Sequence, residues 1–295
     1  MLLSLVCALL FSPEIHEHPG GKILPSEKYI HVISETESPV ERVSIKGKDG
    51  QAIPAAIRKP KGKGPFPVLI HFHGAPGGRG IEKLVTWSRG DTGGPVWERF
   101  LKEGFVVVTA DYRAADFIRL ADPTPPNKVT YVDDGQSVVE YAKQLSYADP
   151  NQITLYGVSL GGDVAIHTAS RVTIKSLILG APAAIQFLGI QFGRNSPAGN
   201  MLYDTERATK NIQGIKCPVL IMVGTRDFLL KADHLLHDLL DKGGKSVRLE
   251  IFQNGYHDFV MGPQGHVGRD EPLMDISLAS LEIAIKFAKE KPREH

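Results

Sequence analysis

Short apolar runs alternate with segments of helical periodicity from about residue 40 to the end of the chain. The first two runs, 40–45 and 52–57, flank the turn-rich tetrapeptide Gly47-Lys48-Asp49-Gly50 and predict an antiparallel hairpin. Among the later runs, 105–110 is continuous and rich in β-branched residues, as expected for a strand that is buried on both faces. Six strands are predicted from the later runs, at residues 68–72, 105–110, 153–156, 176–179, 219–223 and 247–252.

Helices are expected between these strands, where apolar residues recur at helical spacing. Asp133 and Asp134 are expected to cap a helix that continues to about Leu145. The remaining predicted helices are 96–102, 160–169, 229–240 and 276–288. A hairpin followed by repeated strand–helix units predicts an α/β protein with a mostly parallel, eight-stranded sheet and helices on both faces. With no internal repeat or long linker, residues 40–295 are expected to form one domain.

The chain begins with an uncharged apolar run at residues 1–11. This run is too short to span a bilayer, but its length fits the hydrophobic region of a signal peptide. We therefore expect a signal peptide within residues 1–20 and a secreted or periplasmic protein. No Lys or Arg precedes the run, and no Ala-x-Ala cleavage site follows it. The alternatives are a mis-assigned start, or a cytoplasmic protein whose apolar start packs on the body as a strand.

Composition narrows the class of protein further. A hydrophobic content of 42% and a charged content of 23% exclude a disordered, collagen-like or coiled-coil chain. The net charge is +1 and no block of five like charges occurs, so neither nucleic acid nor an anionic membrane is indicated as a partner. The two cysteines, Cys7 and Cys217, have no metal-site spacing, and Cys217 is expected to be a buried hydrophobe.

The strongest chemical signal is Gly157-Val158-Ser159-Leu160-Gly161-Gly162, directly after a predicted strand and directly before a predicted helix. A serine on such a tight turn has strained backbone geometry that exposes its Oγ above the sheet. The flanking glycines allow the sharp turn and a close approach of helix to strand. Ser159 is therefore the predicted nucleophile. The alternative is a glycine-rich turn with an incidental serine.

A nucleophilic serine needs a histidine base and an acid that orients it. In α/β proteins with a serine on such a strand-to-helix turn, the acid comes next in the chain and the histidine follows it. Asp227 follows the strand at 219–223, and His257 follows the strand at 247–252. Both are expected at the same sheet edge as Ser159, where ligands bind in parallel α/β folds. The weaker alternatives are Asp204 and Asp233 for the acid and His266 for the base, with Asp258 competing for contacts beside His257.

An oxyanion hole needs two backbone N–H donors. The first is expected at Leu160, and the second in the loop after the strand at 68–72. In that loop Ala75 is the best donor, because Pro76 has no N–H.

Two pairs of histidines resemble metal ligands in their spacing. His71 and His73 alternate onto one face of a strand, but no third ligand is visible in the sequence. His234 and His237 are one helical turn apart, and a solvated helix face explains them better. We expect neither a metal ion nor an organic cofactor.

Several segments together resemble the α/β-hydrolases grouped around the prolyl oligopeptidase catalytic domain and the dienelactone hydrolases. These segments are 66–74, 104–113, 149–157, the turn at Ser159 and the two segments that carry Asp227 and His257. The resemblance covers about residue 40 to the end and implies the α/β-hydrolase fold. It also implies acyl transfer through a serine ester, with Ser159, Asp227 and His257 as the triad.

The chain departs from that family pattern in three ways. No β-propeller precedes the hydrolase segment, which argues against oligopeptidase action. His257-Asp258-Phe259 stands where His-Gly-Phe is usual, and Ala75 stands where a glycine is common.

The function expected from the sequence is that of an esterase-like serine hydrolase acting on a small-molecule or short acyl substrate. The alternatives are a peptidase or amidase using the same triad, and a binding protein that retains only the fold. Three long loops, 79–94, 114–130 and 183–211, are expected to determine substrate choice, and their aromatic residues Trp87, Phe187 and Phe192 either line a pocket or pack on the sheet.

Overall fold

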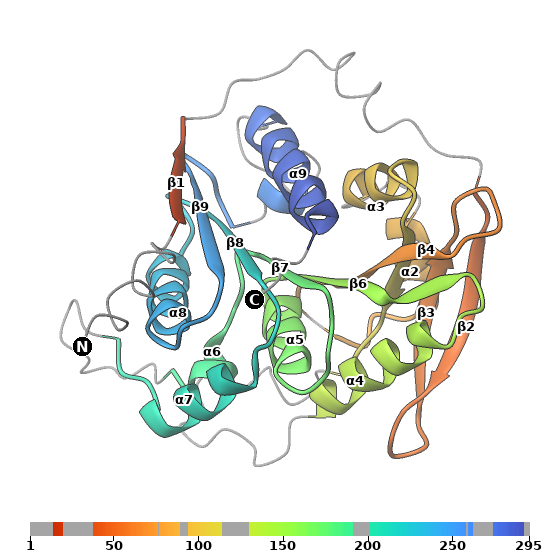
Figure 1. The fold of residues 1–295 in the computed structure, drawn as a ribbon, viewed down its shortest axis with the longest axis horizontal. Coiled ribbons are helices and arrows are strands. Elements are labelled where there is room, and N and C mark those ends of the chain that lie inside the picture. Colours follow the sequence, from red (N-terminus) through yellow and green to blue (C-terminus); the bar gives the residue numbers. More distant parts are fainter. Residues whose placement is uncertain are drawn as a thin grey trace, which may run out of the picture.

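The computed structural model describes residues 14–19, 38–75, 77–88, 94–113, 130–190, 201–257, 259–261 and 274–291. Nine strands in these residues form one twisted sheet (Figure 1). Their spatial order is β1 (Glu14–His18), β9 (Val247–Phe252), β8 (Val219–Gly224), β7 (Ser176–Gly180), β6 (Ala148–Val158), β4 (Phe66–Phe72), β5 (Val106–Ala110), β3 (Ala52–Arg58) and β2 (Val40–Lys46).

The seven strands from β1 to β5 run parallel to one another. β3 is antiparallel to β5 and forms the predicted hairpin with β2. The predicted mostly parallel sheet is thereby confirmed. β5 and β6 lie on opposite sides of β4, so the direction of strand addition reverses at β4. Ligands bind at such switch points, outside the carboxyl ends of the strands.

The ninth strand, β1, is the one that the sequence pattern does not predict. It pairs with β9 from Glu14 opposite Arg248 to His18 opposite Phe252. Four of its five residues are exposed, so it carries no apolar alternation that could reveal it. β1 also falls within residues 1–20, the expected range of the signal peptide. The apolar run itself lies outside the described residues.

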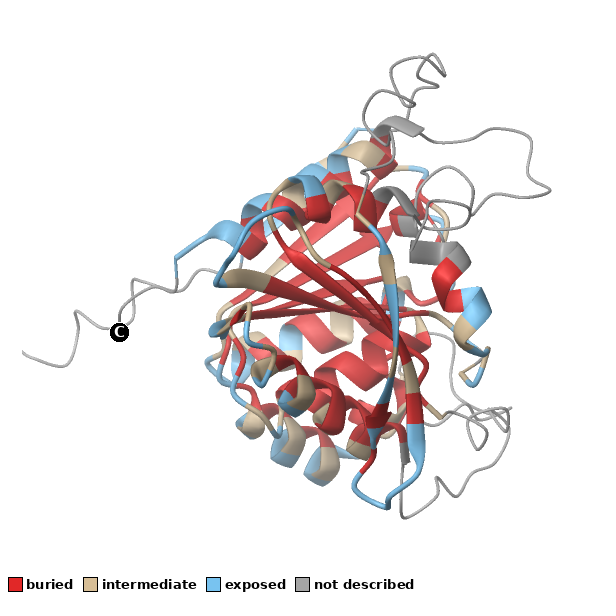
Figure 2. Ribbon diagram, turned by 90° about the vertical axis from the view of Figure 1, so that its right-hand side faces the viewer, coloured by how far each residue is buried: buried red, intermediate tan, exposed pale blue. Residues whose placement is uncertain are grey.

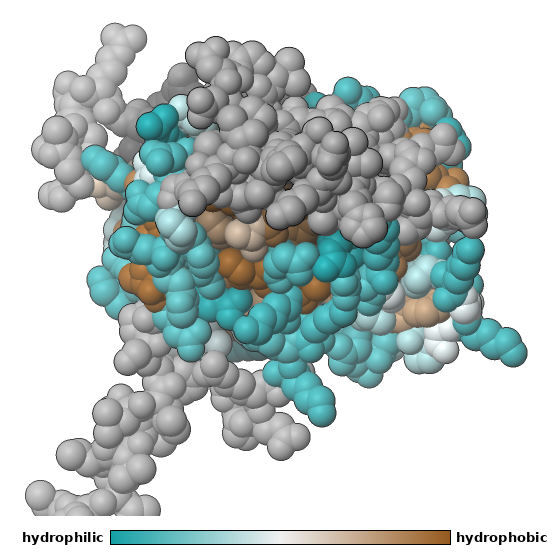
Figure 3. All heavy atoms as spheres, turned by 90° about the horizontal axis from the view of Figure 1, so that it is seen from above, coloured by the Kyte–Doolittle hydropathy of each residue, from teal (hydrophilic) through white to brown (hydrophobic). Residues whose placement is uncertain are grey.

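Helices cover both faces of the sheet, as Figures 1 and 2 show. One face packs against α4 (Thr130–Lys143), α5 (Leu160–Ala169), α6 (Ile185–Leu188), α7 (Thr205–Gly214) and α8 (Leu230–Lys242). The other face packs against α2 (Ile81–Ser88), α3 (Gly94–Lys102), the 3₁₀ turn η3 (Phe259–Met261) and α9 (Met274–Lys289). Seen from the side of α3 and α9, the described surface is mainly hydrophilic, with hydrophobic residues exposed in places (Figure 3).

The start of α4 differs from the prediction. This helix begins at Thr130, so Asp133 and Asp134 lie inside its first turns instead of capping it. Tyr131 belongs to the additional first turn of the helix, and its side chain is buried, at 3% exposure. The two carboxylates have other partners: Asp134 binds the guanidinium of Arg113, with Nε 2.9 Å from Oδ2, and Asp133 lies 3.7 Å from Nζ of Lys48.

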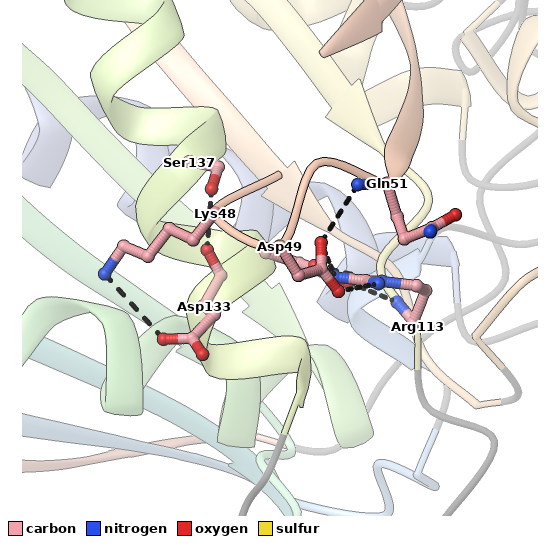
Figure 4. A network of polar contacts seen from close by, with 7 residues as sticks. Lys48, Asp49, Gln51, Arg113, Asp133 and Ser137 are labelled. Atoms are coloured by element: carbon pink, nitrogen blue, oxygen red, sulfur yellow. Dashed lines mark hydrogen bonds and ion pairs between the residues drawn. The ribbon is translucent and has the colours of Figure 1, made fainter. Parts of the chain in front are cut away.

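Arg113 joins three parts of the chain that are distant in sequence (Figure 4). Besides Asp134 in α4, it binds Asp49 in the β2–β3 turn, with Nη1 2.6 Å from Oδ2. These contacts raise the pKa of Arg113, first through Asp134 and then through Asp49. The ion pairs fasten the hairpin turn to the residues that follow β5.

Two of the three predicted loops contain helices. α2 lies within residues 79–94, and α6 lies within residues 183–211, where α7 also begins before continuing to Gly214. Phe187 is fully buried and packs in the core, whereas the side chains of Trp87 and Phe192 lie outside the described set. Most of the third loop, 114–129, also lies outside it. In the described part of the chain, no helix has the length and apolar character needed to cross a membrane.

Candidate active site

Ser159 lies between the end of β6 and the start of α5, as predicted. Its backbone has φ 53° and ψ −121°, a left-handed conformation that a residue with a Cβ rarely adopts. Two hydrogen bonds hold this strained conformation: Ser159 N–H donates to Gly180 O at 3.1 Å, and Ala183 N–H donates to Ser159 O at 2.8 Å. The surrounding structure thus maintains the strain, as is typical of a functional turn.

Two glycines allow helix α5 to begin so close to the sheet. A Cβ added to Gly157 would lie 2.2 Å from the carbonyl oxygen of Gly161. A Cβ added to Gly161 would lie 2.0 Å from the carbonyl oxygen of Phe72 in β4. Neither position can therefore hold a larger residue without moving the turn at Ser159.

The structure brings Ser159, His257 and Asp227 together as a continuous chain of hydrogen bonds. Nε2 of His257 lies 2.9 Å from Oγ of Ser159, and Nδ1 lies 3.0 Å from both carboxylate oxygens of Asp227. The side chain of Asp227 is fully buried, and that of His257 is 22% exposed. A buried carboxylate beside Nδ1 favours the tautomer in which Nε2 can accept a proton from the serine.

Asp227 is held in place by the backbone that follows it. Leu229 N–H donates to Oδ1 of Asp227 at 2.8 Å. Arg226 N–H donates to Gly255 O at 2.9 Å, which ties the turn after β8 to the loop that leads to His257. The acid and the base are thus connected through their backbones as well as their side chains.

The two alternative acids have other surroundings. Asp204 caps the N-terminus of α7, where it accepts a hydrogen bond from Arg207 N–H. Asp233 is buried inside α8, and neither of its carboxylate oxygens has a hydrogen-bond partner among the described residues. Burial, and then the charge of Asp227, raise the pKa of Asp233 well above its ordinary value. The alternative base His266 and the neighbour Asp258 lie outside the described residues.

The loop after β4 passes close to the nucleophile. A Cβ added to Gly74 would lie 3.4 Å from Cβ of Ser159, and Ala75 is the next residue of this loop. Leu160 is the first residue of α5, and N–H groups in the first turn of a helix have no acceptor within that helix. Ala75 and Leu160 are thus placed on two segments that meet at Ser159.

Asp111 and Tyr112 support this loop, a role that the sequence does not predict. Asp111 accepts hydrogen bonds from Arg79 N–H at 2.8 Å and Gly80 N–H at 2.6 Å, and its Oδ1 lies 3.3 Å from Nε2 of His73. The hydroxyl of Tyr112 donates to His73 O at 2.5 Å. Burial alone would raise the pKa of Asp111, but the hydrogen bonds from His73, Gly80 and Arg79 outweigh it and lower that pKa.

The histidine pairs do not form a metal centre in the described residues, where no three His, Cys, Asp or Glu side chains are grouped to hold an ion. His71 is buried between Trp97 and Tyr156, and burial keeps its pKa well below the usual range. His237 is also buried, at 1% exposure, so the prediction of a solvated helix face is wrong for this residue. It faces the sheet because α8 packs closely on β8 and β9.

Solved structures similar to this chain share its fold. They include a protein assigned to the dienelactone hydrolases from Klebsiella pneumoniae (14% identity, 86% of this chain, 100% of that one, TM-score 0.61). An esterase from Pyrobaculum calidifontis is also similar (19% identity, 90% of this chain, 89% of that one, TM-score 0.61). An acylaminoacyl peptidase from Pyrococcus horikoshii is similar over a smaller part of its own length (16% identity, 93% of this chain, 45% of that one, TM-score 0.63).

The family is shown by a match of the amino-acid sequence to a family model. The model of the dienelactone hydrolase family matches residues 53–271, which run from β3 past His257 and include the turn at Ser159. The resemblance expected from the sequence is thereby confirmed, and with it the assignment to the α/β-hydrolases. The chain belongs to the dienelactone hydrolase family.

Proposed function

We propose that this protein is a serine hydrolase that cleaves carboxylic esters through an acyl-enzyme on Ser159. The observation that carries the proposal is the hydrogen-bond chain from Ser159 Oγ through His257 to Asp227. A serine hydroxyl becomes a nucleophile only when a base accepts its proton, and Nε2 of His257 is within reach to do so. The family and the strained turn at Ser159 support the same assignment.

In the proposed mechanism, Oγ of Ser159 attacks the ester carbonyl as its proton passes to Nε2 of His257. Asp227 accepts a hydrogen bond from Nδ1–H and stabilises the imidazolium that forms. The N–H groups of Leu160 and Ala75 donate to the oxyanion of the tetrahedral intermediate. His257 then protonates the leaving alcohol, and water releases the acyl group by the reverse sequence.

A fluorophosphonate probe and a substrate panel test this proposal together. We expect the probe to label Ser159, and the labelling to disappear in Ser159→Ala but persist in Ser170→Ala, a matched change at the other end of α5. The panel consists of p-nitrophenyl esters, acetylated sugars and aminoacyl arylamides. Ester cleavage that survives Ser159→Ala, or a native protein that the probe does not label, would rule the proposal out.

The same panel separates the alternatives. Arylamides cleaved as fast as short acyl esters would indicate a peptidase or amidase on the same triad, the activity named for the Pyrococcus relative of similar fold. A protein that binds but does not turn over any panel member would indicate a binding role. No metal ion or organic cofactor takes part in the proposed mechanism, so chelators are expected to leave the rate unchanged.

A further inference from the structure

Phe228 is an aromatic side chain exposed directly beside the proposed base. It follows Asp227 in the turn after β8 and is 77% exposed, more than any other large hydrophobic residue in the described segments. Its ring centroid lies 4.5 Å from that of His257, with 42° between the ring planes. A single exposed apolar side chain is ordinary on a protein surface, so it is the position of Phe228 that carries meaning.

The position of Phe228 matters because the imidazole of His257 must also deliver a proton to the leaving group. Nδ1 faces Asp227 and Nε2 faces Ser159, so both ring nitrogens are engaged, and Phe228 contacts the ring through its carbon edges or faces. In acyl transfer, Nε2 delivers its proton to the leaving group, which must therefore lie against this imidazole. A leaving group held at Nε2 therefore lies against the same imidazole whose ring centroid is 4.5 Å from that of Phe228.

The turn that carries Phe228 is held rigidly. Asp227 N–H donates to Gly224 O at 3.0 Å, and Thr225 N–H donates to Phe252 O at 2.9 Å. On the same turn Arg226 donates to the hydroxyl of Tyr256 at 2.7 Å and lies over that ring. The Arg226 guanidinium is thus engaged with Tyr256, and Phe228 offers an apolar surface. A contact surface that is already fixed costs little ordering when a ligand binds.

We propose that Phe228 is the specificity-determining residue for the leaving group, and that it favours esters of aromatic alcohols. The inference rests on the proposed function, since it concerns the leaving group of that same acyl transfer. Offset or edge-to-face packing of an aryl ring on Phe228 supplies a contact that a short alkyl group lacks. The contact is lost when the alcohol departs, so it affects acylation and leaves deacylation unchanged.

The test compares ethyl, cyclohexylmethyl and benzyl butyrate, three esters with one acyl group and unactivated alcohols. In Phe228→Ala we expect kcat/KM for the benzyl ester to fall about tenfold, which corresponds to about 1.4 kcal/mol, while the ethyl ester stays within about twofold. Phe228→Leu keeps an apolar side chain and is expected to retain the cyclohexylmethyl ester better than the benzyl ester. Leu202→Ala, at the other exposed hydrophobic site on a described loop, is the matched control and should change neither.

The decay of the butyryl-enzyme, followed by intact-mass spectrometry after quenching, separates a leaving-group contact from support of His257. We expect the decay rate to be the same in Phe228→Ala and in the native protein. Equal losses for all three esters and a slower decay would overturn the inference, because Phe228 would then act through His257. Unchanged selectivity would also overturn it. If Ser159→Ala cleaves these esters as fast as the native protein does, the proposed function itself fails, and this inference with it.

Discussion

The hydroxyl of Tyr131 donates a 2.6 Å hydrogen bond to Oδ2 of Asp163, a fully buried carboxyl one helical turn after Ser159. The other oxygen, Oδ1, accepts from Phe187 N–H at 3.0 Å. His167, on the next turn of α5, has its Nε2 3.6 Å from Oδ2. Asp163 thus joins α4, α5 and α6 behind the nucleophile. The His167 ring is too far from it to donate a hydrogen bond.

Burial raises the pKa of Asp163 to about 7, against the partly opposing effect of these hydrogen bonds. In the unfolded chain an aspartate titrates near 3.9, so between about pH 4 and 7 the unfolded state releases a proton that the folded state keeps. The contribution of Asp163 to stability is therefore full below about pH 4 and is lost as the pH rises toward 7. A difference of this size corresponds to about 4 kcal/mol.

Asp163→Asn should remove this dependence while keeping an acceptor for Phe187 N–H. We expect the free energy of unfolding of the variant, relative to the native protein, to rise between pH 4 and pH 7 in urea titrations. The comparison must be a difference, because burial also lowers the pKa of His167 to about 3 and makes the native protein less stable as the pH falls. A difference between the two proteins that stays constant over this range would contradict the prediction.

Tyr131 and Tyr156 are both buried, and they allow the effect of a hydrogen-bonded hydroxyl on stability to be compared with that of an unbonded one. The hydroxyl of Tyr131 has a partner, whereas that of Tyr156, buried in β6, has none in the part of the chain that the structure describes. Removing one partner of a buried hydrogen bond costs about 1–3 kcal/mol, so Tyr131→Phe should be destabilised by that amount. Tyr156→Phe should be as stable as the native protein or more stable, because the desolvated hydroxyl is lost. Equal destabilisation of both variants, measured by urea unfolding, would show that Tyr156 has a bound partner such as water.

Most of the sheet could be predicted because its strands are fully buried. The buried part of each strand from β4 to β8 appears as an apolar run, and β9 has the predicted bounds, Val247–Phe252. β6 begins earlier than predicted, at Ala148, because most of its first residues are polar and partly exposed. β1 could not be predicted, since an edge strand with exposed residues needs no apolar pattern. α7 was missed for a similar reason: its buried residues are only Ala208 and Ile212, although Asp204 at its start is a typical N-cap.

The candidate site could be predicted as far as its residues follow strands directly. Asp227 and His257 come a few positions after β8 and β9, so their common edge follows from the parallel sheet. Asp111 and Tyr112 could not be assigned, because their partners lie up to 39 residues away in the chain and are brought near only by folding. A supporting hydrogen bond to a distant loop has no local pattern in the sequence.

Three aspartates test the identity of the triad acid. Asp227→Asn should lower kcat by about 10³–10⁴-fold, because an amide favours the wrong tautomer of His257. Asp204→Asn keeps a good N-cap, and Asp233→Asn replaces a carboxyl that makes no hydrogen bond to any described residue, so both should retain a rate within a few-fold of the native protein. Turnover of the best ester in the panel is the measurement. A large loss in Asp204→Asn with Asp227→Asn active would reassign the acid.

The position of β1 makes export a testable proposal. If the apolar run is a signal peptide, cleavage is expected before Glu14, since removal of residues 1–20 would also remove a strand paired with β9. Expression in a bacterial host, fractionation and N-terminal sequencing of the periplasmic protein would locate the cut. A mature protein that starts after His18 would contradict the pairing of β1, and a protein that keeps residue 1 in the cytoplasm would contradict export.

Tyr112 offers a way to test the support of the oxyanion loop without touching the triad. Its hydroxyl binds His73 O and its ring stacks on the His73 ring, with centroids 4.8 Å apart, so Tyr112→Phe removes the hydrogen bond and keeps the packing. The Ala75 N–H is proposed to bind the oxyanion, which exists in the transition state and not in the bound ester. We therefore expect kcat to fall about tenfold while KM stays within about twofold, with the folded fraction at the assay temperature checked by thermal unfolding. Tyr156→Phe, which also removes a buried hydroxyl from this sheet region, is the control and should leave kcat unchanged. A variant that loses affinity at constant kcat would place Tyr112 in substrate binding, because the loop would then act on the ground state.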